Sequence, residues 1–448
     1  MAVAAGPPEV TGGKLDVDTL VSWVHESRER VLDLVADLDE PQLIGPLLET
    51  VNPPIWEVGH LAWFQEAFVL RRACSAQPIL AEAEALYDSA AIPHDTRWQL
   101  KLPSREDTLG YLREVTARVA DRVAGPDATA ALRHFARYAV HHDDMHSEAL
   151  TYTRQTLGYR SPRFSTEFPE APGEPTGPSG PLPGDVAVPG GVALLGADRD
   201  EEFVFDNEKW IHPVKLEPFR IAKAPVTQSE YASFVADGGY DRRVLWDDEA
   251  WGWRQSASAG LPLYWRRSTD GSSERRHFDR WVPLEPHRPV VHVCWYEAKA
   301  YCRWSGRRLP SEAEWETAAL GQSDGGRGLA TKRRRMPWGQ EPASPRLAQL
   351  DWRGMDTSDV AAYPAGYSAF GCRQMVGNVW EWTDTTFRPY PNFEQDAYRD
   401  NSWPWFGTRK VLRGGAWATR SRLVRGTLRN YFTPDRRDVF AGFRTVGL

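Results

Sequence analysis

A proline- and glycine-rich segment divides this 448-residue chain into two parts of different character. Residues 159–190 (YRSPRFSTEFPEAPGEPTGPSGPLPGDVAVPG) carry too many prolines for a helix or a central strand, so we expect an extended surface linker. Residues 15–158 contain few glycines and show helical periodicity, whereas residues 191–448 are rich in Gly, Trp and Arg. The sequence therefore predicts two domains. Residues 1–14 lack a basic, then apolar, leader pattern and are expected to be a frayed tail.

The composition excludes several classes of function. A net charge of −7 argues against a nucleic-acid partner, which usually needs a basic face. No run of 18 apolar residues occurs, so we expect no membrane span. The few, scattered cysteines do not form a disulfide framework and favour a cytoplasmic protein; they are Cys74, Cys294, Cys302 and Cys372.

The first part predicts a bundle of four helices. An apolar stripe marks a helix over 16–38, and Asn52-Pro53-Pro54 precedes a second one that ends near Cys74. Ser104, with Asp107 three residues on, opens a third helix that ends near Val123. A fourth covers 127–157. The interior of such a bundle is a natural place for a metal.

Three histidines of this bundle form a candidate metal site. His142 and His146 lie four residues apart, so their rings share one face of the last helix. His60 stands among large apolar residues of the second helix. A lone pair of histidines at this spacing often arises by chance, and an isolated buried histidine is more often structural than a ligand. Nitrogen ligands alone suit Fe(II), Zn and Cu equally.

The triple His60, His142 and His146, with Glu148 two residues beyond, resembles the iron site of the DinB-type bundle in ergothioneine-synthesising enzymes, the non-haem iron sulfoxide synthases. The second part resembles the formylglycine-generating-enzyme fold, a divergent C-type-lectin-like domain. The resemblance implies an α+β multidomain protein, a DinB-like four-helix bundle followed by that domain. The motifs that carry it include Pro225-Val226-Thr227, Arg308-Leu309-Pro310-Ser311-Glu312-Ala313-Glu314-Trp315-Glu316, Gly377-Asn378-Val379-Trp380-Glu381-Trp382-Thr383, Arg413-Gly414-Gly415-Ala416-Trp417 and Ala441-Gly442-Phe443-Arg444.

The fold resemblance does not by itself give the function. Most of these motif residues read as scaffold, since Gly377-Asn378 suits a turn and the tryptophans suit a core. The sulfatase-activating relatives need a cysteine pair after the Gly-Gly-x-Trp element, but residues 418–425 contain none. Formylglycine generation is therefore not expected, and the resemblance implies that the second domain covers the metal site of the first.

The resemblance also implies a reaction. Members of the family join a chalcogen to the imidazole C2 of hercynine, with Fe(II) as cofactor and O2 as co-substrate. A tyrosine of the second domain supplies a proton or hydrogen atom; we align Tyr398 with it, and Tyr390 is the competitor. The segment around Asn430 and Tyr431 resembles the one that holds the betaine, the amide by a hydrogen bond and the ring by its face.

The chalcogen donor is predicted from three positions. The resemblance suggests that enzymes using glutamyl-cysteine hold it with two arginines and an acid; here Arg97 keeps one arginine, His94 stands near the other and Phe432 replaces the acid. A phenyl ring cannot pair with an ammonium group but can stack on a sugar. Phe432 and the pattern from Asn52 to His60 together resemble the sequences of selenoneine synthases, which use a selenosugar.

Three alternatives stay open. The first is an ergothioneine-type enzyme that uses glutamyl-cysteine or cysteine as its donor. The second is a ligand-binding module without metal, and the third is a zinc-dependent thiol transferase. The sequence gives no oligomeric state.

Overall fold

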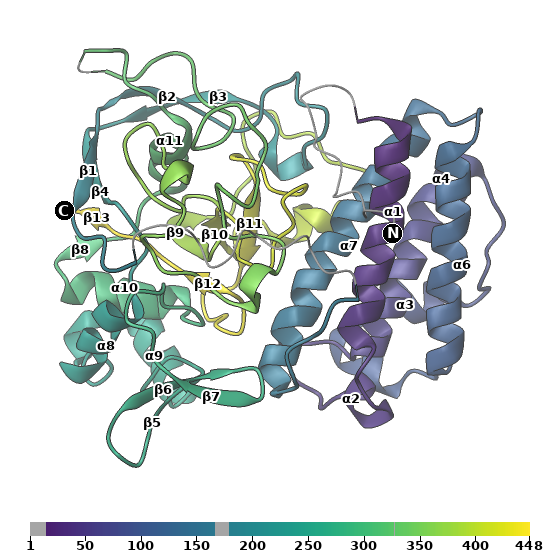
Figure 1. The fold of residues 1–448 in the computed structure, drawn as a ribbon, viewed down its shortest axis with the longest axis horizontal. Coiled ribbons are helices and arrows are strands. Elements are labelled where there is room, and N and C mark those ends of the chain that lie inside the picture. Colours follow the sequence, from purple (N-terminus) through teal and green to yellow (C-terminus); the bar gives the residue numbers. More distant parts are fainter. Residues whose placement is uncertain (1–14, 166–178, 327) are drawn as a thin grey trace, which may run out of the picture. The chain divides into compact units, whose positions relative to one another are not determined.

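The computed structural model describes residues 15–165, 179–326 and 328–448. The chain forms two compact units, Met1–Pro169 and Glu170–Leu448. In Figure 1 the first unit runs from purple to blue and the second from teal to yellow. The expected tail, residues 1–14, and the middle of the expected linker, residues 166–178, lie outside the described residues.

The first unit is a bundle of long helices, as predicted. Figure 1 shows these helices lying side by side, with α1 against α6 and α7 and with α3 against the same two. The second of the predicted helices is interrupted by a π-helical turn, η1. The long helices are α1 (Val17–Val35), α3 (Pro54–Gln65) with η1 (Glu66–Arg71) and α4 (Arg72–Cys74), α6 (Arg105–Ala124) and α7 (Ala130–Leu157); the short ones are α2 (Glu40–Ile44), α5 (Ala83–Tyr87) and the 3-10 helix η2 (His94–Gln99).

Caps and burial explain where these helices lie. Asp16, Ser104 and Thr129 each accept a hydrogen bond from the backbone amide three residues on, which fixes the starts of α1, α6 and α7. All twelve residues of α3 are buried. Because α3 is surrounded by protein, its polar side chains also lie in the interior, where they need partners.

The second unit contains short strands in several small sheets. One sheet has the order β1-β4-β13-β8, from Asp185–Val188, Phe219–Ala222, Val446–Gly447 and Arg307–Arg308. Another has the order β11-β10-β9-β12, from Arg429–Phe432, Lys410–Arg413, Trp380–Thr386 and Ala441–Gly442. β2 (Gly191–Leu195) pairs with β3 (His212–Leu216), and a three-stranded meander joins β5 (Trp265–Arg267), β6 (Ser273–His277) and β7 (Arg280–Pro283).

Helices accompany these sheets. They are α8 (Gln228–Ala236), α9 (Asp248–Ser256), α10 (Trp295–Trp304) and α11 (Glu312–Leu320). Single 3-10 turns are η3 (Asp206–Glu208), η4 (Arg243–Leu245), η5 (Arg353–Met355), η6 (Pro364–Gly366), η7 (Arg399–Asn401) and η8 (Trp403–Trp405).

The predicted linker, residues 159–190, includes a strand near its C-terminal end. Residues 185–188 form β1, which pairs antiparallel with β4. The side chains of Val186 and Val188 are buried, so a short alternating pattern outweighs the surrounding turn residues. The neighbouring prolines, Pro183 and Pro189, flank the strand without interrupting its ladder.

The motif tryptophans of the second unit are core residues, as the sequence predicts. Trp315 is fully buried, and its indole donates a hydrogen bond to Glu381, 2.8 Å away. The same carboxylate pairs with buried Arg444. Trp382 donates to the carbonyl of Val293 at 2.9 Å. These motifs therefore identify the fold and stabilise it.

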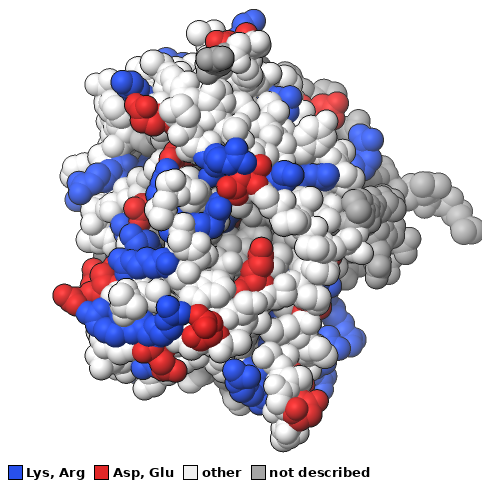
Figure 2. Space-filling model, turned by 90° about the vertical axis from the view of Figure 1, so that its left-hand side faces the viewer, with Lys and Arg blue, Asp and Glu red and all other residues white. Residues whose placement is uncertain are grey.

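Two observations concern the surface. Figure 2 shows one face of the molecule, on which lysine and arginine are interspersed with aspartate and glutamate. Within the described ranges, we find no helix that combines the length and the apolarity needed to cross a bilayer.

Candidate functional site

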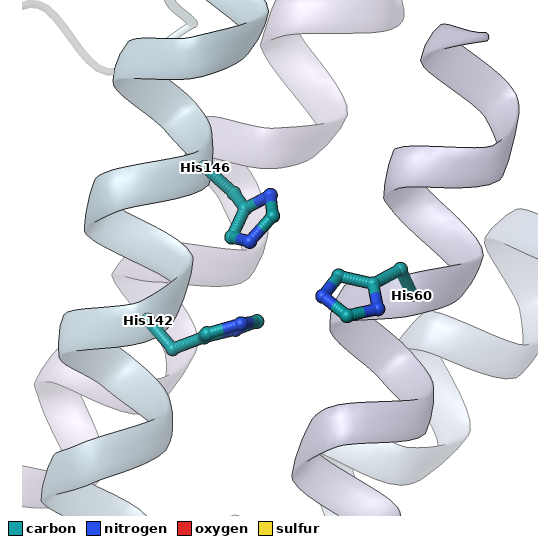
Figure 3. Close-up of side chains that lie close together, drawn as sticks. All are labelled: His60, His142 and His146. Atoms are coloured by element: carbon teal, nitrogen blue, oxygen red, sulfur yellow. The ribbon is translucent and has the colours of Figure 1, made fainter. Parts of the chain in front are cut away.

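The three predicted histidines converge in the interior of the bundle. One nitrogen of each of His60, His142 and His146 lies within 4.8 Å of the others. Figure 3 shows His142 and His146 on one helix, α7, with their rings directed toward His60 on the facing helix, α3. His60 and His142 are almost wholly buried, whereas 23% of the His146 side chain is exposed. The cluster is therefore a deep site with one edge accessible at His146.

The backbone fixes the orientation of His60. Its Nδ1 donates to the carbonyl oxygen of Tyr87 at 2.8 Å. A carbonyl can only accept, so Nδ1 carries the proton and Nε2 keeps a lone pair toward the cluster. Gly59 makes this approach possible, because a Cβ there would lie 2.1 Å from the Tyr87 ring. The absence of a side chain at Gly59 therefore allows Tyr87 to lie close enough to bond His60.

A buried carboxylate fixes the orientation of His146. Its Nδ1 lies 2.6 Å from Oε2 of Glu57, which is 4% exposed. Burial alone would raise the pKa of Glu57, but the neighbouring His146 charge and hydrogen bond hold that pKa at about 2. Glu57 is therefore a carboxylate at neutral pH and accepts the Nδ1 proton of His146. Outer carboxylates of this kind orient the histidine ligands of metals.

Burial keeps the other two imidazoles neutral. It lowers the pKa of His60 to about 3 and that of His142 well below its ordinary value, with the charge of His146 adding to both effects. The ring of His142 also stacks on Phe64, with 3.7 Å between centroids and 9° between planes. Neutral imidazoles offer the lone pairs that a metal needs, so the donor set fits a divalent transition metal held by three nitrogens.

The two predicted donor contacts of the first unit lie on η2. Arg97 is buried, and its guanidinium donates to the side chain of Asn52 and to two carbonyl oxygens, with its face 4.0 Å from the Trp56 ring. His94 is half-buried, and its Nε2 donates to the carbonyl of Val51 at 2.7 Å. Arg97 is thus engaged with the bundle itself.

The two candidate tyrosines of the second unit have different surroundings. Tyr390 is 7% exposed, its ring lies 4.1 Å from the Arg429 guanidinium, and its hydroxyl is buried without a hydrogen-bond partner among the described residues. Burial raises the pKa of Tyr390 well above its ordinary value. Tyr398 is partly exposed at the start of η7, near Tyr431. Solvent can therefore reach Tyr398 more readily than Tyr390.

The predicted substrate segment is the strand β11. Alternation along a strand puts Asn430 and Phe432 on one face and Tyr431 on the other. The Tyr431 ring stacks on Phe387 at 4.0 Å, and its hydroxyl donates to the carbonyl of Asn401. The side-chain oxygen Oδ1 of Asn430 accepts a hydrogen bond from the backbone amide of Tyr431 at 2.8 Å. All three side chains are partly exposed.

Sequence reasoning missed Glu57 and Asn52 as parts of the site. The Asn52 side chain does not cap α3, whose N-cap is Pro53, but donates to Glu57 at 2.8 Å. The available signal was an acidic residue in an otherwise apolar helix, three residues before a candidate ligand.

Comparison with known proteins gives matches over both units. The DinB superfamily model matches residues 23–150, and the sulfatase-modifying factor enzyme 1-like domain matches residues 171–447. A hercynine oxygenase of Mycolicibacterium smegmatis is 35% identical over 95% of this chain and 98% of its own length. One from Mycolicibacterium thermoresistibile is 37% identical over 95% and 94%. A formylglycine-generating enzyme of Streptomyces coelicolor is 32% identical over 58% of this chain and 88% of its own.

Proposed function

This chain belongs to the hercynine oxygenase family, a family of oxidase-type enzymes, and we propose that it is an Fe(II)- and O2-dependent enzyme that joins selenium to the imidazole C2 of hercynine. The observation that carries the proposal is the group of three imidazoles, two of them buried, of which one nitrogen each lies within 4.8 Å of the others. The family is named for an oxygenase and not for a thiol transferase, which favours iron over zinc in this site.

His60, His142 and His146 would hold the iron. One nitrogen of each ring lies within 4.8 Å of the others, and the bonds to Tyr87 and Glu57 fix the tautomers of two of them. Fe(II) bound by three nitrogens would supply the activation of O2, which Zn(II) cannot provide. The residues themselves provide a rigid and mostly water-excluded setting for that chemistry.

The proposed reaction balances with a selenol donor and one O2. The imidazole C2–H and the Se–H bonds break, and a C–Se bond forms. One oxygen atom of O2 leaves as water with the two hydrogens, and the other remains on selenium as a selenoxide. O2 is reduced by four electrons, which come from the carbon and selenium centres.

Residues of the second unit would bind hercynine and move a proton. Tyr398 is our choice for the proton or hydrogen-atom donor, because the Tyr390 hydroxyl is enclosed in protein. Asn430 would hydrogen-bond the betaine. Tyr431 lies on the opposite face of β11 and stacks on Phe387, so an aromatic contact from its ring to the trimethylammonium group stays a prediction from the sequence.

Phe432 supports the selenosugar as the donor. Its ring is partly exposed on the same face of β11 as Asn430, and the guanidinium of Arg436 lies 4.9 Å away. A phenyl ring can stack on a sugar, whereas the ammonium group of glutamyl-cysteine needs an anionic partner. His94 and Arg97 stay predictions as further donor contacts.

The second candidate is an ergothioneine-type sulfoxide synthase, with glutamyl-cysteine or cysteine as the donor. The names of the relatives fit it as well as the first candidate, since this chain is 35–37% identical to proteins named hercynine oxygenase and that name does not state a donor. The two candidates share iron, O2 and hercynine and differ only in the chalcogen donor.

A donor competition tests the choice. Iron-loaded protein receives hercynine, O2 and equal amounts of the selenosugar and glutamyl-cysteine, and mass spectrometry measures both adducts. We expect the selenium adduct to dominate, and Phe432→Asp to shift the ratio toward the sulfur adduct by about 10–100-fold, the value of one charge-assisted hydrogen bond. A dominant sulfur adduct from the unaltered protein would establish the ergothioneine-type alternative instead.

A further inference from the structure

We propose that Arg97, Asn52 and Glu57 form a chain of hydrogen bonds that sets the orientation of His146, so that all three are positioning residues of the metal centre. The inference rests on the proposed function only in taking the three histidines as metal ligands. It assigns Arg97 a role inside the first unit, distinct from the donor contact that the sequence predicts.

Three bonds connect these side chains in sequence. Nη1 of Arg97 donates to Oδ1 of Asn52 at 2.6 Å. Nδ2 of Asn52 donates to Oε1 of Glu57 at 2.8 Å. The other oxygen of that carboxylate, Oε2, accepts from Nδ1 of His146 at 2.6 Å. Because the Asn52 amide receives at one end and donates at the other, Arg97 determines which way it faces, and Asn52 in turn fixes the carboxylate.

The far end of this chain is anchored. Arg97 is 8% exposed, and its Nη2 also donates to the carbonyls of Ser89 and Ile92, 3.4 and 3.3 Å away. Its guanidinium therefore has several contacts that hold it in one place. Because its donor is charged and buried, the hydrogen bond from Arg97 to Asn52 is stronger than one between neutral groups.

A second contact path leads from Arg97 to another ligand. The guanidinium carbon lies 4.0 Å from the Trp56 ring centroid. Trp56 in turn stacks on His60, with 5.1 Å between centroids and 10° between planes, and its indole nitrogen donates to the carbonyl of Leu86 at 2.7 Å. Arg97 thus supports His60 by packing and His146 by hydrogen bonds. Loss of its side chain should disturb both ligands.

Metal affinity separates this role from donor binding. Full-length Glu57→Gln, Asn52→Ala and Arg97→Ala are titrated anaerobically with Co(II), whose visible spectrum reports ligand geometry, and with Fe(II) in competition with a chelator. We expect Glu57→Gln to weaken metal binding roughly 10–100-fold, the usual effect of removing an outer-shell partner, with smaller losses and altered Co(II) bands for the other two. We expect the Arg97→Ala change to appear in the metal affinity and in the Co(II) bands, whereas loss of a donor contact would raise the donor KM at saturating iron and leave both unaltered.

Asp95→Asn is the matched control, since Asp95 is an exposed acid of the same short helix. It should bind Co(II) like the unaltered protein. Far-UV circular dichroism identifies variants that fold; if one does not, the other two still decide the question. Unchanged metal affinity and spectra in the folded variants, or an Arg97→Ala effect confined to the donor KM, would overturn the proposal.

The same titration keeps the two proposals apart. Unaltered protein that binds Co(II) and Fe(II), and loses affinity in these variants, supports the positioning role even if no donor gives product. Absence of product would then contradict the proposed reaction alone. Unaltered protein that binds neither metal would overturn the positioning role as well.

Discussion

The proposed metal site of the first unit and the proposed substrate segment of the second are built by different means. His60 and His142 are buried, and His60 and His146 each form a hydrogen bond that orients the ring. Even the glycine beside His60 is required by packing. Asn430, Tyr431 and Phe432 instead stand partly exposed on a short strand. A strand position can change its side chain without disturbing the core, whereas a ligand of α3 cannot. From this comparison we expect that the fold fixes the proposed metal site and that a few surface positions choose the substrate.

Replacing a ligand should have the largest effect. His142→Ala removes one of three nitrogens and leaves a cavity beside Phe64. We expect it to abolish stoichiometric iron binding and to reduce turnover by well over the ~100-fold typical of outer-shell substitutions. Metal analysis after anaerobic loading, with product formation measured in parallel, checks this. Full iron content in the variant would show that His142 is not a ligand.

Replacing the proposed proton donor should have the next largest effect. Tyr398→Phe removes the proposed proton donor, so product formation should fall by about 100-fold or more while iron binding is unaffected. Tyr390→Phe is the matched comparison; its hydroxyl is buried without a partner among the described residues, so its loss should change neither turnover nor stability much. The reverse pattern would assign the role to Tyr390.

A change beside a ligand tests how tightly the fold fixes the centre. Gly59→Ala places a Cβ 2.1 Å from the Tyr87 ring and must displace the carbonyl that holds His60. We expect a loss of about 1–3 kcal/mol in unfolding free energy together with weaker Fe(II) binding. Gly110→Ala, on α6 with open space around its Cβ, is the control and should leave both unchanged or slightly improve stability. Unaltered metal affinity in Gly59→Ala would show that the centre is more adaptable than we infer.

The smallest effect concerns a buried histidine of the second unit. Burial, with the charges of Arg275 and Arg276, lowers the pKa of His292 to about 3. The unfolded chain takes up this proton near pH 6.5 and the folded chain does not. Stability should therefore fall as pH falls below 6.5, by roughly 1.4 kcal/mol per pH unit.

His292→Asn isolates that contribution, because Asn does not titrate here and tolerates the positive φ of 62° at this position. Urea unfolding at pH 7 and pH 5 should show a weaker pH dependence in the variant, with or without iron. Equal pH dependence in the two proteins would show that His292 is protonated in the folded state.

Much of the bundle could be predicted from sequence. Helical periodicity, the cap at Ser104 and the proline at the first position of α3 locate its helices, and the spacing of His142 and His146 predicts one face. What could not be predicted is contact between distant segments. The bond between His60 and Tyr87, and that between Glu57 and His146, depend on how helices pack and leave no periodic signal.

The second unit could be predicted mainly as an ordered series of motifs. Its strands are two to seven residues long, too short for a clear period, and β1 lies within a proline-rich stretch. The order of the motifs identified the fold class, which the family match over residues 171–447 confirms. The surroundings of Tyr390 and Tyr398 follow from tertiary packing, so the sequence alone left the choice between them open.

The most direct test of the account is an iron titration of activity. Metal-free protein receives Fe(II) in steps under anaerobic conditions, followed by hercynine, the selenosugar and O2, and the adduct is quantified by mass spectrometry. The account predicts a linear rise that ends at one iron per chain and no product with Zn(II). Product formed equally well with Zn(II), or in the presence of an iron chelator, would contradict it.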